Sequence, residues 1–324
     1  MAWRMRYLVT GGSGFIGSHL VEYLLAQGDQ VTVVDIVHRP TKAMFVAGSV
    51  TDESLMDALI EKHDAVFHLA SVVGFANVLR STKRTILTST IGSGEVFHIA
   101  AKHRKRTLFT STSAVYGRWA NGGAPVKESE DVVLGPTSTA SWSYAYAKAT
   151  DEALAFAYAR EERLPVIVCR VFNTVGPRQS AEAGFVLPRF VRQAVQDQPL
   201  TVHKPGTQTR TFCHVKDTVA ALARLMECDA APGQLVNVGG NQTASILELA
   251  DMVCDLSESS SRIAIVEPPY VGYDNVTDRA PDLTKLRGLI NFAPQYRLGD
   301  MISDTIEECE QSGTAVLGEG GQAA

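Results

Sequence analysis

Short runs of β-branched and aliphatic residues alternate with helix-length segments from Met1 to about Phe172. Strands that alternate with helices build βαβ units, in which helices cover both faces of a parallel sheet. The pattern therefore predicts a doubly wound α/β domain. The apolar runs behind this prediction are Tyr7-Leu8-Val9, Val31-Thr32-Val33-Val34, Ala65-Val66-Phe67-His68, Thr107-Leu108-Phe109 and Val166-Ile167-Val168.

The rhythm loosens after Pro177, where glycine and proline interrupt the apolar runs. Such punctuation predicts a smaller, loop-rich C-terminal lobe that contributes substrate contacts. We expect residues 1–176 to form the first domain, with a returning segment at about 212–240, and residues 177–311 to form mainly the lobe. The last residues, 312–324, are rich in Gly and Ala with little to bury, so we expect a flexible tail.

The composition is that of an ordinary globular protein: 324 residues, 45% hydrophobic and 20% charged. A chain of this length can bury one large core, or two that share a cleft. The net charge of −5 and the scattered basic residues provide no field that would attract nucleic acid. We therefore expect no nucleic-acid partner.

No apolar run approaches the roughly 18 residues of a membrane span, and the first residues lack the apolar region of a signal peptide. We expect a cytoplasmic protein that does not contact membranes. The five cysteines are an odd number and are widely spaced, without a Cys-x-x-Cys pair. This spacing predicts reduced thiols and no metal site.

A glycine-rich turn follows the first predicted strand and opens an apolar-periodic helix. Its glycines allow the backbone to approach a pyrophosphate, whose charge is stabilised by the free amides at the helix start. The segment predicts the dinucleotide site of a Rossmann domain. It reads Thr10-Gly11-Gly12-Ser13-Gly14-Phe15-Ile16-Gly17, and its expected cofactor contacts are Gly11, Gly14, Phe15, Ile16 and Gly17.

The second predicted strand ends at Asp35, 18 residues beyond Gly17. A carboxylate at this offset accepts hydrogen bonds from the ribose hydroxyls of the cofactor. It would also repel a 2′-phosphate, so the sequence favours NAD over NADP. Arg39 leaves some room for NADP through charge pairing, although an arginine solvated on a loop is the simpler interpretation.

Tyr144 and Lys148 are four residues apart at the start of a predicted helix, so one helical turn places them on the same face. An ammonium beside a phenol favours the phenolate. Moving a tyrosine pKa from ~10 to ~7 requires about 4 kcal/mol, which Lys148 and a positively charged nicotinamide could supply together. Tyr144 would then accept a hydroxyl proton as hydride leaves the substrate. Tyr146 has the wrong spacing for this role.

A Tyr-x-x-x-Lys pair alone is common on helix surfaces, but its surroundings favour catalysis. Hydroxyl side chains cluster where the fifth predicted strand ends, in Thr110-Ser111-Thr112-Ser113. The carboxyl ends of parallel strands are where open α/β sheets bind ligands. We therefore expect Thr112 and Ser113 to join Tyr144 and Lys148 in the catalytic site.

These motifs together resemble the extended short-chain dehydrogenase/reductases that act on nucleotide sugars, from Thr10 to about Thr305. The matching segments, besides the glycine turn and the Tyr144–Lys148 pair, are His68-Leu69-Ala70, Ser111-Thr112-Ser113, Val115-Tyr116-Gly117, Arg170-Val171-Phe172-Asn173-Thr174-Val175-Gly176-Pro177-Arg178, Pro199-Leu200-Thr201-Val202-His203, Thr209-Arg210-Thr211-Phe212 and Asp278-Arg279-Ala280-Pro281-Asp282.

The resemblance implies roles for individual residues. Thr112 would hydrogen-bond the sugar hydroxyl that is oxidised, and Asn173 would hold the diphosphate. Val202 and His203 would flank the uracil, while Arg210 and Arg279 would bind phosphate, as forked guanidinium donors do. Further NAD contacts would come from Ser49, Val50, Leu69, Ala70 and Ser71, together with Tyr144 and Lys148.

Two departures from the family pattern affect these expectations. Ser49 stands near the position of an aspartate that usually contacts the adenine, which weakens one cofactor contact. Ala114 precedes Val115-Tyr116-Gly117, where the family's 4,6-dehydratases and uronate decarboxylases carry a glutamate. Alanine cannot move a proton, and an acid–base group is usually worth about 10² to 10⁴ in rate.

The leading hypothesis is therefore a UDP-sugar 4-epimerase, with UDP-uronic acids among its candidate substrates. A UDP-glucuronate decarboxylase or 4,6-dehydratase is the alternative, because the segments 173–178 and 279–282 look more like those of the decarboxylases. A 4-ketoreductase would consume NADH, and a catalytically silent NAD-binding protein would lack turnover. The resemblance also implies a homodimer, built on helices at about 81–103 and 140–163.

Overall fold

Seven parallel strands form the central sheet of the computed structural model, which describes residues 4–118, 124–268 and 278–318. The doubly wound α/β prediction is confirmed. In spatial order, the strands are β10 (Leu235–Val238), β6 (Val166–Val171), β5 (Arg106–Thr112), β4 (Ala65–His68), β1 (Arg6–Thr10), β2 (Gln30–Asp35) and β3 (Met44–Ala47).

The chain winds outward in both directions from β1, because β2 and β3 lie on one side of it and β4, β5 and β6 on the other. The strand order therefore reverses between β1 and β4. Connections on the two sides of this point leave the sheet in opposite directions, which opens a crevice at the carboxyl ends of the strands.

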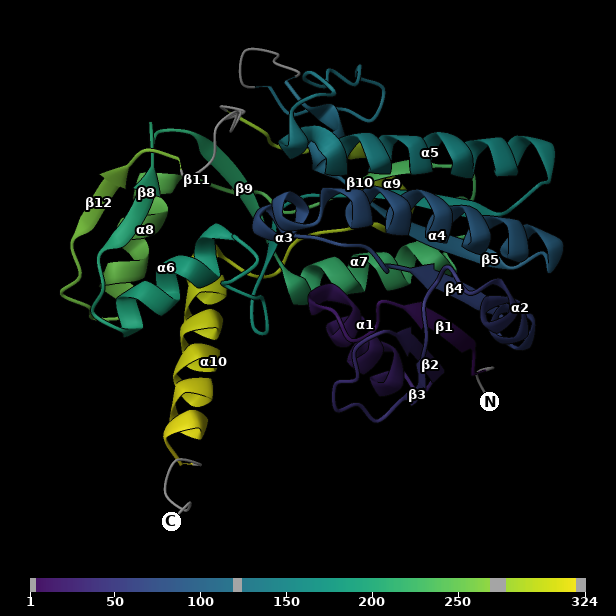
Figure 1. The fold of residues 1–324 in the computed structure, drawn as a ribbon, viewed down its shortest axis with the longest axis horizontal. Helices are drawn as coiled ribbons and strands as arrows, with labels where there is room; N and C mark the ends of the chain where they lie inside the picture. The colour runs from purple at the N-terminus through teal and green to yellow at the C-terminus, as the bar shows by residue number, and fades with distance from the viewer. Residues whose placement is uncertain (1–3, 119–123, 269–277, 319–324) are drawn as a thin grey trace.

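Helices cover both faces of the sheet (Figure 1). One face packs against α1 and α7, and the other packs against α2, α4 and α5. Buried aliphatic and aromatic residues fill both layers, as the near-continuous apolar strands require. The bounds are Phe15–Ala26 for α1, Glu53–Lys62 for α2, Thr82–Lys102 for α4, Ser143–Glu161 for α5 and Val215–Glu227 for α7.

Short elements lie between these layers and at the sheet edge. They are α3 (Phe75–Arg80), the 3₁₀ turns η1 (Ser113–Tyr116) and η2 (Ala140–Trp142), and α9 (Thr284–Ile290). The segment containing α7 and β10 returns to the large sheet, where Leu235–Val238 pairs with Val168–Val171. Helix α9 packs beside β10, so residues beyond 280 also contribute to the large domain's core.

The smaller lobe, to the left in Figure 1, has its own apolar core. Two small sheets and three helices enclose this core. The bounds are β7 (Thr174–Val175), β9 (Thr209–His214), β11 (Gln242–Ser245), β8 (Leu200–His203), β12 (Ile263–Val266), α6 (Val186–Val195), α8 (Ile246–Leu256) and α10 (Leu298–Gly318).

Helix α10 continues through residues 312–318, where the sequence analysis expected the start of a flexible tail. Residues 319–324 lie outside the described part of the chain, and the mobility of the tail stays a prediction. Within the described residues, no helix is long and apolar enough to cross a bilayer.

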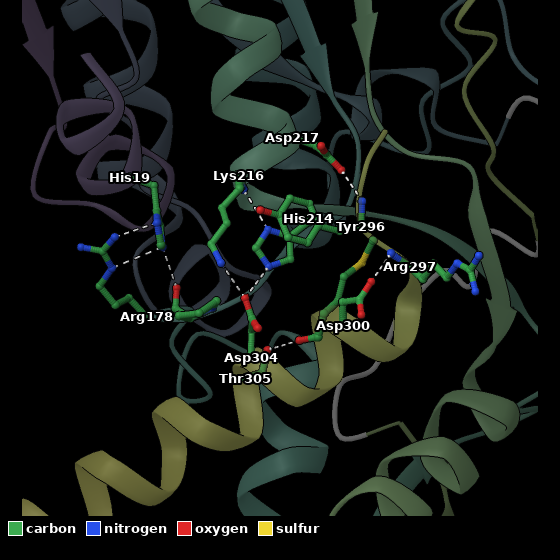
Figure 2. Close-up of polar contacts among 12 residues, drawn as sticks. His19, Arg178, His214, Lys216, Asp217, Tyr296, Arg297, Asp300, Asp304 and Thr305 are labelled. Atoms are coloured by element: carbon green, nitrogen blue, oxygen red, sulfur yellow. Dashed lines mark hydrogen bonds and ion pairs between the residues drawn. The ribbon is translucent and has the colours of Figure 1, made fainter. Parts of the chain in front are cut away.

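A polar cluster joins the lobe to the large domain (Figure 2). His214 caps α7 by accepting from the amide of Lys216 at Nδ1, 3.0 Å away, so its proton lies on Nε2. That nitrogen and the Lys216 ammonium both bond Asp304 of α10, at 3.2 and 2.9 Å. Burial lowers the pKa of His214, which keeps the imidazole neutral in this arrangement.

The same region anchors the segment that comes after β7. The guanidinium of Arg178 forms an ion pair of 2.7 Å with Glu22 of α1. Arg178 also contacts the His19 ring at 2.7 Å (Figure 2), and His19 contacts the carbonyl of Pro177 at 3.0 Å. The chain after Pro177 is therefore held against α1, where it borders the crevice at the end of the sheet.

Candidate active site

The crevice at the strand-order reversal is a cleft of about 1190 Å³. Residues after β1, β2, β4, β5 and β6 line it, together with residues from α3, α5, α6 and the smaller lobe. A site for one drug-sized ligand is usually about 300–1,000 Å³. The cleft is therefore larger than the usual site for one drug-sized ligand.

The glycine turn forms one wall of the cleft. Gly11 has a φ of +71°, and a Cβ atom there would lie 2.8 Å from the Cα of Ala70. A Cβ on Gly17 would lie 2.2 Å from the carbonyl oxygen of Gly11. Helix α1 begins with Gly14 as N-cap, without a capping side chain or an acid in its first turn. Its first amides are thus available to an anion.

Asp35 lies at the end of β2 beside this turn. Its two carboxylate oxygens accept from the amides of Ser13 and Val37, both at 3.1 Å. These bonds fix the carboxylate at the cleft wall and leave further lone pairs for a ligand. Such an arrangement suits ribose hydroxyls.

The other residues expected to contact the cofactor line the same cleft: Gly14, Phe15, Ile16, Ser49, Val50, Leu69, Ala70 and Ser71. The Oγ atom of Ser71 is buried and has no hydrogen-bond partner in the described part of the chain. An orphaned hydroxyl at a cleft wall fits a ligand that completes its hydrogen bonding. The glycine cradle, Asp35 and Ser71 therefore fit a bound dinucleotide.

The catalytic candidates meet where β5 ends and α5 begins. Thr112 is the last residue of β5, and its hydroxyl hydrogen-bonds the Tyr144 phenol in the first turn of α5. Lys148 lies one turn further along α5 and is 1% exposed. Its ammonium donates to the carbonyl of Thr110 at 3.0 Å and lies 4.5 Å from the centre of the Phe109 ring. All of these residues except Phe109 line the cleft.

Burial shifts the pKa values of Tyr144 and Lys148 in opposite directions. The pKa of Tyr144 is raised by burial, with the Thr112 hydrogen bond opposing the shift. Burial lowers the pKa of Lys148 to about 8, although the nearby Asp151 and Glu152 carboxylates oppose that shift. From the sequence, we expect Lys148 and a positively charged nicotinamide together to lower the pKa of Tyr144. In the protein alone that pKa is raised, so a phenolate requires the further positive charge in the cleft.

The expected hydroxyl cluster is divided between the cleft and the core. The Ser111 hydroxyl is buried and donates to Glu152 at 2.5 Å. Glu152 in turn forms a buried ion pair of 2.7 Å with Arg170 of β6. Ser113 is buried at the start of η1 and lines the cleft. Thr112 is therefore the hydroxyl placed directly against Tyr144.

The substrate-binding candidates are more dispersed. Asn173, His203 and Arg210 line the cleft, and the Asn173 amide donates to the carbonyl of Thr211 at 3.1 Å. Val202 instead lies in the core of the smaller lobe, where its side chain is fully buried. Arg279 lies behind the lining and donates to the carbonyl of Gly117 at 2.9 Å. Burial and the neighbouring Arg210 lower the pKa of Arg279 to about 10.

Sequence reasoning missed most of the cleft's positive charge. Among the described residues, the arginines that line the cleft beside Arg39 and Arg210 are Arg80, Arg84, Arg189 and Arg192. Arg189 and Arg192 are three residues apart on α6 and share a helix face, whereas Arg80 ends α3 and Arg84 lies in the first turn of α4. The spacing of Arg189 and Arg192 was the available signal in the sequence, but a charged pair on one helix face is usually just exposed to solvent.

Sequence comparison relates the chain to enzymes of nucleotide-sugar metabolism. Residues 7–239 match the NAD dependent epimerase/dehydratase family. A UDP-N-acetyl-alpha-D-glucosaminuronate decarboxylase from Bacillus cytotoxicus is 36% identical, over 94% of this chain and 97% of that protein. UDP-glucuronic acid decarboxylase 5 from Arabidopsis thaliana is 32% identical, over 91% of this chain and 86% of that protein.

Solved structures show the same fold along nearly the whole chain. UDP-glucose 4-epimerase from Thermotoga maritima, crystallised with UDP-glucose, superimposes with a TM-score of 0.86 and 27% identity, over 95% of this chain and 99% of that one. MoeE5 in complex with UDP-glucuronic acid and NAD gives a TM-score of 0.84 and 26% identity, over the same shares. The chain belongs to the NAD dependent epimerase/dehydratase family, which confirms its resemblance to the extended short-chain dehydrogenase/reductases.

Proposed function

We propose that this protein is a UDP-sugar 4-epimerase, with UDP-uronic acids among its candidate substrates. The supporting observation is the composition of the cleft around Thr112, Tyr144 and Lys148. Among the described lining residues, the carboxylates are Asp35 and Glu182. Asp35 is bonded beside the glycine turn, and Glu182 is largely exposed and paired with Arg192. The acid–base groups beside Thr112 are thus Tyr144 and Lys148.

Two acid–base groups suffice for inversion at C4. Thr112 holds the C4 hydroxyl by a hydrogen bond, and Tyr144 removes its proton. The bound nicotinamide would supply the hydride chemistry, removal from C4 and return to the other face once the 4-keto sugar has turned over. The ammonium of Lys148 stabilises the phenolate form of Tyr144. Because both the hydride and the proton return to the sugar, the reaction ends without net oxidation.

The arginines that line the cleft support a nucleotide-linked substrate. Arg189 and Arg192 on α6 and Arg210 on β9 line the cleft on the smaller-lobe side, and Arg80 and Arg84 line it opposite. Guanidinium groups recognise phosphate by paired donors. A nucleoside diphosphate carries about two negative charges, and a uronate adds a third, so these arginines suit both substrate classes.

A UDP-glucuronate decarboxylase is the second candidate, because the two sequence relatives from Bacillus and Arabidopsis are uronate decarboxylases. Oxidation at C4 converts a uronate into a β-keto acid, which can lose carbon dioxide without an added base. The same Thr112, Tyr144 and Lys148 would carry out the oxidation. A 4,6-dehydratase is less suited to this cleft, since dehydration requires acid–base groups at C5 and C6.

Product analysis distinguishes these activities. We expect the purified protein with NAD to invert C4 of UDP-glucose, UDP-glucuronate or one of their N-acetyl relatives, as monitored by proton NMR. Release of carbon dioxide and a pentose product would favour the decarboxylase instead. Accumulation of a free 4-keto sugar would favour a dehydratase, and stoichiometric NADH consumption would favour a 4-ketoreductase.

Replacing the phenol tests the proton-transfer role. Tyr144→Phe should lower turnover at least about 10²-fold while NAD affinity stays unchanged, because it removes an acid–base group without removing the ring. Tyr146→Phe is the matched control, since the Tyr146 hydroxyl donates to the carbonyl of Gly135 and does not reach the cleft. Comparable turnover in both variants would refute the assigned role.

Asp35 should determine cofactor affinity and selectivity. Asp35→Ala removes the acceptor for the ribose hydroxyls and the charge that repels a 2′-phosphate. We expect the Kd for NAD to rise about tenfold or more, which corresponds to about 1.4 kcal/mol, while the Kd for NADP changes less. Calorimetric titration of both cofactors measures this difference, and an equal change in both constants would contradict the assignment.

We also propose a homodimer formed through α4 and α5, which pack side by side on one face of the sheet (Figure 1). Helix α4 exposes three large apolar side chains, Ile86, Leu87 and Ile91, at 38%, 45% and 47%. Apolar groups clustered on one helix face favour burial against a second copy.

A charge introduced on this face tests the dimer. The wild-type protein should elute at twice the chain mass in light-scattering chromatography, and Ile91→Glu should yield monomers because it would bury a carboxylate in the interface. Ile265→Glu on β12 is the control, since Ile265 is 53% exposed on another element. A wild-type protein that is monomeric at micromolar concentration would overturn the proposal.

A further inference from the structure

The helix that carries Tyr144 and Lys148 also carries a buried carboxylate that the proposed reaction does not use. Asp151 lies three residues after Lys148 on α5, so the two side chains share a helix face. Asp151 is 0% exposed and Lys148 is 1% exposed. Taking a carboxylate out of water is costly unless it is paired or hydrogen-bonded, so this position requires a physical explanation.

The two serines that bond Asp151 come from the neighbouring helix α4. Ser89 donates to Oδ2 at 2.5 Å, and Ser93 donates to the same oxygen at 3.1 Å. The second oxygen, Oδ1, is buried and has no hydrogen-bond partner in the described part of the chain. The carboxylate is therefore half satisfied by hydrogen bonds, and its remaining stabilisation must be electrostatic.

A chain of hydrogen bonds runs from the cofactor wall to this carboxylate. The Thr10 hydroxyl accepts from the amides of Leu69 and Ala70, both at 3.2 Å, so its own proton is free to bond Nδ1 of His68 at 2.8 Å. Nε2 of His68 then contacts the Ser93 hydroxyl at 3.1 Å.

The direction of each bond in this chain is determined by the groups at its ends. His68 accepts at Nδ1, so its proton lies on Nε2 and is donated to Ser93. Burial lowers the pKa of His68 to about 3, which keeps the ring neutral. Ser93 accepts from His68 and therefore donates to Asp151. Every donor in this chain points toward Oδ2, which therefore acts as an acceptor. Burial raises the pKa of Asp151, and the charge of Lys148 and the two serine hydrogen bonds oppose that shift in favour of the ionised form.

We propose that Asp151 is a positioning residue for catalysis: its caged carboxylate keeps the Lys148 ammonium charged beneath Tyr144 in a site from which water is excluded. The proposal rests on the hydride-transfer role proposed for Tyr144 and Lys148. Lys148, one turn earlier on the same helix, is the cation whose charge favours the ionised form of Asp151. The chain of hydrogen bonds stabilises an anion at Asp151. Its donors come from three elements, β1, β4 and α4.

The other charged and titratable groups around Lys148 do not replace this carboxylate. From α5 come Tyr144, which is neutral in the resting protein, and Glu152, which forms the buried pair with Arg170 of β6. From β4 comes the neutral His68, and β5 contributes the carbonyl of Thr110. Asp151 and Glu152 both oppose the lowering of the Lys148 pKa, but the charge of Glu152 is shared with Arg170.

The test measures the protonation of Lys148 directly. Lysines are labelled at Cε in the full-length protein with NAD bound, and the Lys148 signal is identified by its loss in Lys148→Met. We expect wild-type Lys148 to titrate near its pKa of about 8. Asp151→Asn should move that midpoint down by at least about one pH unit, a tenfold change in the acid-dissociation constant. The alkaline limb of kcat/KM should move with it.

Asp217→Asn is the matched control. Asp217 is also a buried aspartate, at 4% exposure, but it accepts from the amides of Gln295 and Tyr296 far along the chain from the catalytic helix (Figure 2). A variant that merely loosens the fold should leave the Lys148 midpoint in place. Asp151→Ser removes the same charge with a smaller side chain and carries the test if Asp151→Asn does not fold.

The outcomes separate this proposal from the proposed function. An unshifted Lys148 midpoint in a folded Asp151 variant overturns it, whatever the enzyme's reaction. The titration requires no sugar nucleotide, so a downward shift supports the role of Asp151 even if no C4 inversion is found with any UDP-sugar. A shift of equal size in Asp217→Asn would also overturn it, because the effect would then be structural.

Discussion

The parallel register of β1, β4, β5 and β6 is the constraint on which the site depends. Thr10 of β1 pairs with His68 of β4, and Thr112 of β5 pairs with Val171 of β6, so these strands end at one edge. Residues from four distant stretches of sequence therefore meet there. The reversal of strand order between β1 and β4 turns this edge into a cleft, which the smaller lobe then encloses.

The catalytic candidates Tyr144 and Lys148 are buried, although the proposed proton transfer requires charged forms of both. Burial raises the pKa of Tyr144 and lowers that of Lys148, so desolvation works against the charged form of each group. A proton-transfer site must reverse part of this preference. The positive nicotinamide would favour the phenolate, and the carboxylate of Asp151 favours the ammonium. Charge at the site is thus supplied from both sides of the catalytic pair.

The proposed roles of Thr112, Tyr144 and Lys148 would serve epimerisation and decarboxylation equally, up to the C4 ketone. The fate of that ketone depends on groups near C5 and C6 and on whether the keto-sugar can turn over within the cleft. Ala114 precedes the buried Val115 and Tyr116, and Tyr116 donates to Asn237 rather than to the cleft. This composition is the reason that we propose inversion, whereas the sequence relatives are decarboxylases.

Local patterns in the sequence were sufficient for the fold class, and they selected candidate cofactor residues that line the cleft. The candidates Gly11, Gly17 and Asp35 are recognised by short-range spacing, and Tyr144 and Lys148 are related by one helical turn. The smaller lobe was harder, because its phosphate-binding candidates come from irregular segments. Val202 lies in the core of the smaller lobe, and Arg279 donates to the carbonyl of Gly117. Residue spacing in the sequence does not show how deeply such side chains are buried.

Only the tertiary structure decided which polar groups face one another. The arginines of α3, α4 and α6 gather at one cleft because separate helices pack around the same strand edge, which no local spacing encodes. The serines of α4 bond Asp151 of α5 for the same reason, although they precede it by more than 50 residues in the sequence. The sequence by itself determined the chemistry that the chain carries. Packing decided where burial changes the charge of those groups, because desolvation depends on neighbours brought from every part of the chain.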